Sequence, residues 1–167
     1  MGVDDRLAEL HIVIPETTTP VANYVTARRA GSLLFFSGHL AKRDGAVVTG
    51  RVGDDVDTDT AYDLARRAAI DLLGTARSAL GTLDTVAVVK LTGFVQSTPA
   101  FTEQSAVING ASDLLVAVFG PDRGRHARSA VGVVQLPLGA AGRYTRPVAG
   151  LNDIGDQLCP PPGPGEI

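Results

Sequence analysis

The sequence has very few cysteine and aromatic residues. Its 167 residues include one cysteine, one methionine and no tryptophan, and aromatic residues make up 5%. The single Cys159 excludes an intrachain disulfide and a cysteine-based metal site. The three histidines show neither HxxxH nor HxH spacing, so no metal-ligand motif is present. We therefore expect a core of small aliphatic residues and no bound metal.

Long apolar runs and blocks of basic residues are missing as well. No run approaches the ~18 consecutive apolar residues of a membrane-spanning helix. The first ten residues, MGVDDRLAEL, lack the basic start and apolar stretch of a signal peptide. The net charge is −3, from 15 basic and 18 acidic residues, which gives no indication of nucleic-acid binding. We expect a cytoplasmic protein without a membrane or nucleic-acid partner.

The length fits one domain with a proper core. We expect an N-terminal extension at 1–19, a domain at 20–149 and a Pro/Gly-rich tail at 150–167. The extension should contain a short helix over residues 3–10 with Leu7 and Leu10 facing inward. The composition of the tail predicts disorder.

Hydrophobic periodicity predicts the main elements. Apolar residues at helical spacing predict helices over 57–80, ending at Gly81, and over 101–119, ending at Gly120-Pro121. Alternating or β-rich runs predict strands over 22–28, 33–37, 85–96 and 127–136. Within 85–96 the alternation places Val89 on an apolar face with Ala87, Leu91, Gly93 and Val95.

The resulting order is β-β-α-β-α-β. Two strand–helix–strand passages predict an α+β fold, a mixed sheet with two helices packed on one face. So few helices leave the other sheet face bare. Because its small apolar residues need a partner, we expect an oligomer.

The most informative segment is His126–Gly139, HARSAVGVVQLPLG. Arg128 stands at the entrance of the strand predicted here, which should end near Leu136 because Pro137 cannot donate to a sheet ladder. The planar, permanently charged guanidinium of an arginine in this position can bind a carboxylate through two parallel hydrogen bonds. The alternative for Arg128 is a surface or interface salt bridge.

Three segments together carry a resemblance to a known family. They are YVTARRAGSLLFFSG at 24–38, FTEQSAVINGASDLLVAVFG at 101–120, and HARSAVGVVQLPLG. Over residues 20–141 the chain resembles an uncharacterised branch of the reactive-intermediate deaminase superfamily (Rid/YjgF, endoribonuclease L-PSP-like). The resemblance implies a chorismate-mutase-like fold and a homotrimer with a ligand pocket at each subunit interface.

The resemblance also implies an activity and a set of site residues. Deaminating members hydrolyse small 2-imino or enamino acids to 2-keto acids and ammonia without a metal or an organic cofactor. Arg128 matches their catalytic, carboxylate-binding arginine, so the implied partner is a small-molecule carboxylate. Tyr24 and Ser37 match the pocket tyrosine and serine, and Asn109 matches a helix asparagine near the pocket.

Two positions depart from the family pattern. Ala130 replaces a frequent cysteine, and Arg143 replaces the glutamate thought to orient the attacking water. A cation cannot accept a proton from water, so Arg143 weakens the deaminase reading. The abrupt loss of the pattern after Ala141 suggests the hypothesis of a replaced carboxyl end or a shifted reading frame.

The sequence is compatible with other functions of the protein and with other roles of these residues. The chain could be a non-catalytic carboxylate-binding protein on the same trimeric scaffold. A ribonuclease follows only the historical family label, and the acidic balance argues against it. Tyr24 could be an interface residue, and the Ser37 hydroxyl could be satisfied by backbone at a strand end. His39 and His126 are candidate acids or bases.

Overall fold

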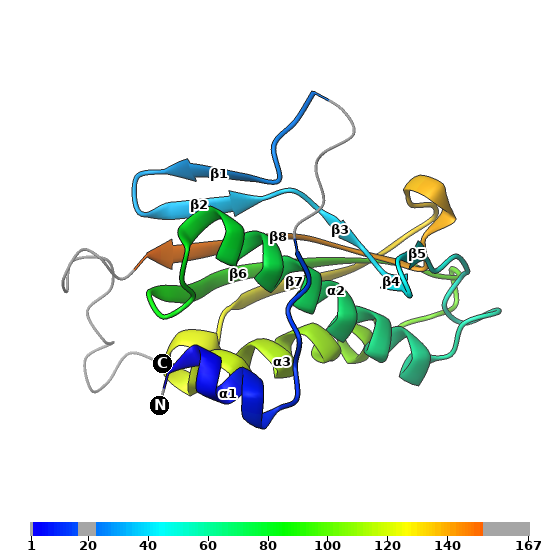
Figure 1. Ribbon diagram of the computed structural model, residues 1–167. Coiled ribbons are helices and arrows are strands. Elements are labelled where there is room, and N and C mark those ends of the chain that lie inside the picture. Colours follow the sequence, from blue (N-terminus) through cyan, green and yellow to red (C-terminus); the bar gives the residue numbers. More distant parts are fainter. Residues whose placement is uncertain (1, 17–22, 152–167) are drawn as a thin grey trace, which may run out of the picture.

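A mixed sheet covered on one face by two long helices forms the framework of the computed structural model (Figure 1). The structure describes residues 2–16 and 23–151, and only the backbone of 143–151. The elements in chain order are α1 (Val3–Glu9), β1 (Ala27–Ala30), β2 (Leu33–Phe36), β3 (His39–Leu40), β4 (Lys42–Arg43), β5 (Ala46–Val47), α2 (Thr58–Leu80), β6 (Val86–Gln96), α3 (Gln104–Gly124), β7 (Ala127–Val133), the 3-10 turn η1 (Pro137–Gly139) and β8 (Gly142–Leu151).

The strand order decides where the functional residues lie. The main sheet runs β1-β2-β8-β6-β7, and β3 also pairs with β8. Strands β6 and β7 are parallel and are joined by α3, whereas the other pairs in this sheet are antiparallel. The predicted α+β fold with helices α2 and α3 on one face is confirmed (Figure 1). Strands β1 and β7 form its opposite edges.

Strand β8 is not predicted by the sequence, although it pairs with β2, β3 and β6 in the middle of the sheet. Its segment lacks clear alternation and contains Pro147, which argues against a central strand. The register against β6 shifts between Lys90 and Thr92, at the level of Pro147, so the proline falls at an irregularity. The strand continues to Leu151, into the range predicted as a disordered tail. Residues 152–167 lie outside the described residues.

A second irregularity corrects the predicted faces of β6. The register shifts between Val88 and Lys90, which changes the alternation. Val86 and Val88 are therefore buried on the same side as Leu91, while Val89 is 45% exposed. The prediction that Ala87 and Val89 share one face with Leu91, Gly93 and Val95 is wrong, because a bulge cannot be recognised in an uninterrupted β-rich run.

Three predicted boundaries also differ from the structure. The first strand covers Ala27–Ala30 rather than 22–28, and residues 17–22 are outside the described part. Strand β7 ends at Val133 rather than near Leu136, because the chain leaves the sheet before the turn η1. Helix α3 begins at Gln104 rather than Phe101. Its regular part breaks at Gly120 (φ 79°), as predicted, but Pro121 starts a last turn to Gly124.

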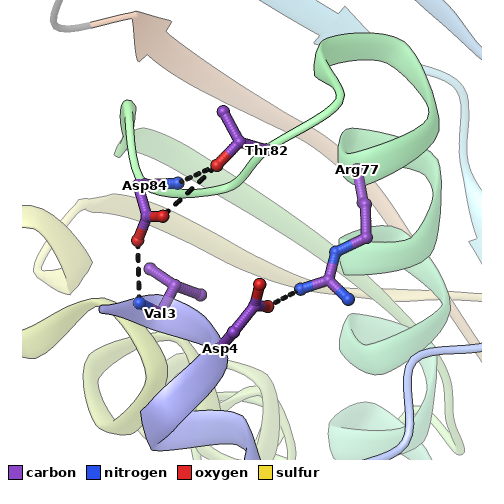
Figure 2. A network of polar contacts seen from close by, with 5 residues as sticks. All are labelled: Val3, Asp4, Arg77, Thr82 and Asp84. Carbon is purple, nitrogen blue, oxygen red and sulfur yellow. Dashed lines mark hydrogen bonds and ion pairs between the residues drawn. The ribbon is translucent and has the colours of Figure 1, made fainter. Parts of the chain in front are cut away.

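Helix α1 packs against the same core. Val3 and Leu7 are buried, whereas Leu10, predicted to face inward, is 37% exposed because the helix ends at Glu9. The Val3 amide donates to Asp84 Oδ1 at 2.8 Å, and Asp4 forms an ion pair with Arg77 (Figure 2). These contacts tie α1 to the end of α2 and to the loop that follows it. No helix in the described ranges is long and apolar enough to cross a membrane.

Glycines fix the position of α3 between the sheet and α2. A Cβ atom at Gly110 would lie 2.0 Å from the Tyr62 carbonyl oxygen of α2, and one at Gly93 would lie 2.2 Å from Ile108 Cδ1. The Tyr62 hydroxyl donates to Asp113 Oδ2 at 2.9 Å and adds a polar bond between the helices. Only glycine permits this spacing, so α3 has one rotation about its axis.

We expect Gly110→Ala to lower the free energy of unfolding by roughly 1–3 kcal/mol, because the added methyl group overlaps backbone that cannot yield easily. Urea denaturation measures the change. Ser105→Ala, at an exposed position of the same helix, is the control and should stay within about 0.5 kcal/mol of the unsubstituted protein. Equal stability of both variants would contradict the close packing of α2 and α3.

Candidate active site

Arg128 lies at the beginning of β7, on the sheet side that carries α3. It pairs with Leu91 of the parallel strand β6. Its side chain is exposed and reaches α3, where Nη1 donates to Asn109 Oδ1 at 2.7 Å and to Ser112 Oγ at 3.2 Å. The structure thus brings together Arg128 and Asn109, two of the predicted site residues.

The bonds of Arg128 leave one edge of its guanidinium open. Both Nη1 hydrogens are directed to α3. Within the described residues, Nε and Nη2 make no hydrogen bond, and Arg128 forms no ion pair. The Nε–Nη2 edge presents two parallel N–H groups, which is the geometry that a carboxylate accepts. An arginine that is held in this way and has no acidic partner among the described residues can bind a small anion.

Behind Arg128 lies the half-buried His126. Its Nδ1 is 2.6 Å from the Gly124 carbonyl oxygen, and its Nε2 is 3.1 Å from Ser112 Oγ. Burial lowers the pKa of His126 below its ordinary value of 6.5; the bond to Gly124 opposes this shift, and the charge of Arg128 adds to it. The lowered pKa favours the neutral form of the His126 ring at pH 7.

Tyr24 and Ser37 form a second group, at the end of the β1–β2 hairpin. Tyr24 is 52% exposed in the segment before β1. Just after β2, the Ser37 hydroxyl donates to the Val25 carbonyl at 2.6 Å and its amide donates to Thr26 at 2.8 Å. The Ser37 hydroxyl thus has the backbone partner that the alternative reading foresees.

The two groups lie toward opposite edges of the sheet. Strands β8 and β6 separate the β1–β2 hairpin from β7. With about 4.8 Å between neighbouring strands, β2 and β7 are roughly 14 Å apart. A small ligand on Arg128 therefore cannot touch Ser37 of the same chain. A site containing Arg128, Asn109, Tyr24 and Ser37 needs a second copy.

The resemblance implies a glutamate at position 143, and the structure defines the backbone of this position. Arg143 in β8 pairs with Phe94 of β6 and with Leu40 of β3. Arg143 therefore stands in a central strand, and the chain keeps its strand pairing beyond Ala141. The Arg143 side chain lies outside the described part of the chain.

A cleft of about 380 Å³ between α2 and the β3–β5 segment lies apart from these groups. It contains His39, whose Nε2 is 2.9 Å from Thr75 Oγ1, together with Lys42 and Asp71. Burial raises the pKa of Asp71, and Lys42 opposes the shift. His39 therefore packs on α2 instead of joining Ser37. The described residues contain no group of three or more His, Cys, Asp or Glu side chains able to hold a metal ion.

Ser112 is the site residue that the sequence alone does not single out. It lies three positions after Asn109, which places both on one helix face. His126 lies two positions before Arg128, which places both on one side of an extended chain. These spacings are detectable signals, but they gain meaning only when α3 is known to cross β7.

We expect His126 to make folding less favourable in acid. The unfolded chain takes up a proton at this ring near its ordinary pKa of 6.5, whereas burial holds the folded pKa lower. As the pH falls from about 7 to 5, the unfolded state therefore binds more protons than the folded state, and the free energy of unfolding decreases. Urea unfolding at both pH values should show a smaller decrease for His126→Gln. An identical decrease in both proteins would contradict this role of His126.

Comparisons with known proteins place the chain. Residues 15–141 match the family model described as Endoribonuclease L-PSP. The chain is 48% identical over 138 residues to Protein TCP17 of Trypanosoma cruzi, covering 81% of this chain and 86% of that protein.

Solved structures agree with this result. The protein Atu1372 of Agrobacterium tumefaciens, described as of unknown function, is 41% identical with a TM-score of 0.81, covering 89% of this chain and 92% of that one. The YjgF gene product of Escherichia coli is 20% identical with a TM-score of 0.54, covering 81% and 93%, and it shares the chorismate-mutase-like fold. The chain belongs to the endoribonuclease L-PSP family, the Rid/YjgF family that its sequence resembles.

Proposed function

We propose that this protein binds a small 2-imino or enamino acid through Arg128 and hydrolyses it to a 2-keto acid and ammonia. The observation that carries the proposal is the Nε–Nη2 edge of Arg128, which makes no bond to the described residues while Nη1 is held by Asn109 and Ser112. Membership of the Rid/YjgF family supports the reaction class.

Binding would begin at the carboxylate of the substrate. Its two oxygens accept from Arg128 Nε and Nη2, and the fixed guanidinium orients the adjacent C=N bond. An enamine enters the reaction as its imine tautomer. Water then adds to the imine carbon, its two protons pass to the nitrogen, and the carbon–nitrogen bond breaks as the carbonyl forms, so that the nitrogen leaves as ammonia. The sum is imine plus water giving keto acid plus ammonia, and no electrons are transferred.

The attacking water would be oriented by backbone carbonyl groups, since Arg143 occupies the position of the family's glutamate. This substitution favours one alternative, a protein that binds carboxylates in the same pocket without turnover. The formal net charge of −3 speaks against a ribonuclease, because binding of a phosphate backbone relies on basic side chains.

The site would be completed by a neighbouring copy in a homotrimer. Arg128 and Tyr24 lie toward opposite edges of one sheet, so Tyr24 and Ser37 of the next chain would close the pocket. Exposed apolar side chains on the face away from α2 and α3 support this arrangement. They include Phe35 of β2, Val89 of β6 and Val131 of β7. Burial of such a patch drives association.

We expect Arg128→Ala to weaken binding of a 2-keto acid by roughly ten- to a hundredfold, the effect of losing a charged bidentate hydrogen bond. Arg128→Lys should fail to restore it, because an ammonium group has no planar fork. Calorimetric titration with 2-oxobutanoate measures the affinity, with Arg125→Ala at an exposed neighbouring position as the control.

The same variants distinguish an enzyme from a binding protein. An amino acid oxidase generates the imine in the assay, and the release of keto acid is followed with and without this protein. Acceleration that disappears in Arg128→Ala supports hydrolysis. Binding without acceleration supports the non-catalytic alternative, and undiminished activity of Arg128→Ala would refute the proposal.

Mixing two inactive variants tests the shared pocket. Arg128→Ala keeps the Tyr24 side of the site, and Tyr24→Ala keeps the Arg128 side. If each pocket combines two chains, random trimers refolded from an equal mixture should recover roughly a quarter of the sites. Recovered keto-acid binding after co-refolding is the expected result, and no recovery would contradict a pocket shared between two chains.

A further inference from the structure

We propose that Ser112 and His126 are positioning residues that hold the Arg128 guanidinium in the orientation required for the carboxylate. The inference rests on the proposed function of Arg128 and adds two residues that do not touch the ligand. Three hydrogen bonds connect Arg128 Nη1, Ser112 Oγ, the His126 ring and the Gly124 carbonyl.

The direction of these bonds follows from the chemistry of the groups. The Gly124 carbonyl can only accept, so His126 Nδ1 carries the hydrogen. In the neutral ring Nε2 is then unprotonated and accepts, so the hydrogen of the Ser112 hydroxyl points to His126. A lone pair of Ser112 Oγ is thereby turned toward Arg128 Nη1, 3.2 Å away. Each donated hydrogen has one acceptor, and the chain of bonds from Arg128 through Ser112 to His126 has a defined hydrogen position at every step.

The consequence for Arg128 is a fixed guanidinium. An arginine side chain loses up to about 2 kcal/mol of rotamer entropy when it is ordered. The bonds to Asn109 and Ser112 order it before the ligand arrives, so less of this cost falls on binding. Asn109 alone would fix one Nη1 hydrogen. Ser112 fixes the second and with it the plane of the group.

The surroundings of His126 suit this role. The ring is half-buried between α3 and the start of β7, and burial keeps its pKa below the ordinary value, so Nε2 remains an acceptor at neutral pH. Ser112 contributes no charge that would compete for Arg128. Replacing either member removes an acceptor or its orientation but leaves every charge of the carboxylate site in place.

Two substitutions at position 126 separate the two bonds of the ring. The amide of His126→Asn can replace Nδ1 and keep the bond to Gly124, but it does not reach Ser112. The amide oxygen of His126→Gln can replace Nε2 and accept from Ser112. Positioning through Ser112 therefore predicts that Gln rescues and Asn does not. A merely structural role of the ring would favour neither pattern.

The experiment is calorimetric titration of the full chain with 2-oxobutanoate at pH 7.5. We expect Ser112→Ala and His126→Asn each to weaken binding by roughly three- to tenfold, because part of the entropy of ordering Arg128 then falls on binding. His126→Gln should bind within about twofold of the unsubstituted protein. The Ser112→Ala/His126→Asn double variant should be no weaker than either single variant, because both break the same chain of bonds.

Arginine side-chain NMR of the ligand-free protein gives an independent readout. Held Nη1 hydrogens rotate slowly and give resolved signals in the unsubstituted protein and in His126→Gln. We expect these signals to collapse in His126→Asn and Ser112→Ala. If Ser112→Ala does not fold, the Asn and Gln variants at position 126 still decide the question.

The binding role of Arg128 and the positioning role of Ser112 and His126 can fail separately in these experiments. Loss of binding in Arg128→Ala with unchanged affinity and resolved Nη1 signals in Ser112→Ala and His126→Asn would overturn the positioning role alone. Equal weakening in His126→Asn and His126→Gln would also overturn it. Unchanged affinity in Arg128→Ala would overturn the proposed function, and the positioning role with it.

Discussion

The close contact of α3 with the sheet and with α2 is the constraint on which the site depends. Gly93 admits Ile108, and Gly110 admits the backbone of Tyr62, so the helix can lie in only one rotation. This rotation directs Asn109 and Ser112 toward the start of β7. Arg128 can therefore bind Asn109 and Ser112 because Gly93 and Gly110 have no side chain that would displace α3.

The strand order imposes a second constraint. Insertion of β8 between β2 and β6 separates the β1–β2 hairpin from β7, and with them the two halves of the predicted site. The open sheet face with Phe35, Val89 and Val131 presents apolar surface that association can bury. Assembly and ligand binding are thus linked in the proposed function, because a complete pocket would exist only between copies.

Much of this architecture is predictable from local patterns. Helices α2 and α3 and strands β2, β6 and β7 follow from periodicity and from signals such as Gly81 and Gly120. The bulge at Val88 and Lys90 is not predictable, because it is set by pairing with β8. Strand β8 itself lacks a local hydrophobic pattern, and it is held in the sheet by backbone pairing with β2, β3 and β6.

The candidate site shows the same division. Arg128 and Asn109 can be named from sequence by family resemblance, and the structure adds their contact. The bond between Ser112 and His126 joins residues 14 positions apart and depends on the last turn of α3 after Gly120. Strand β8 is present at Arg143, but the sequence has an arginine where the resemblance implies a glutamate.

The most direct test is a crystal structure of the protein with 2-oxobutanoate. We expect a carboxylate within hydrogen-bond distance of Arg128 Nε and Nη2, Nη1 still bound to Asn109 and Ser112, and Tyr24 of a neighbouring copy closing the pocket. A ligand bound elsewhere, or Arg128 paired with a carboxylate of the protein itself, would contradict this expectation.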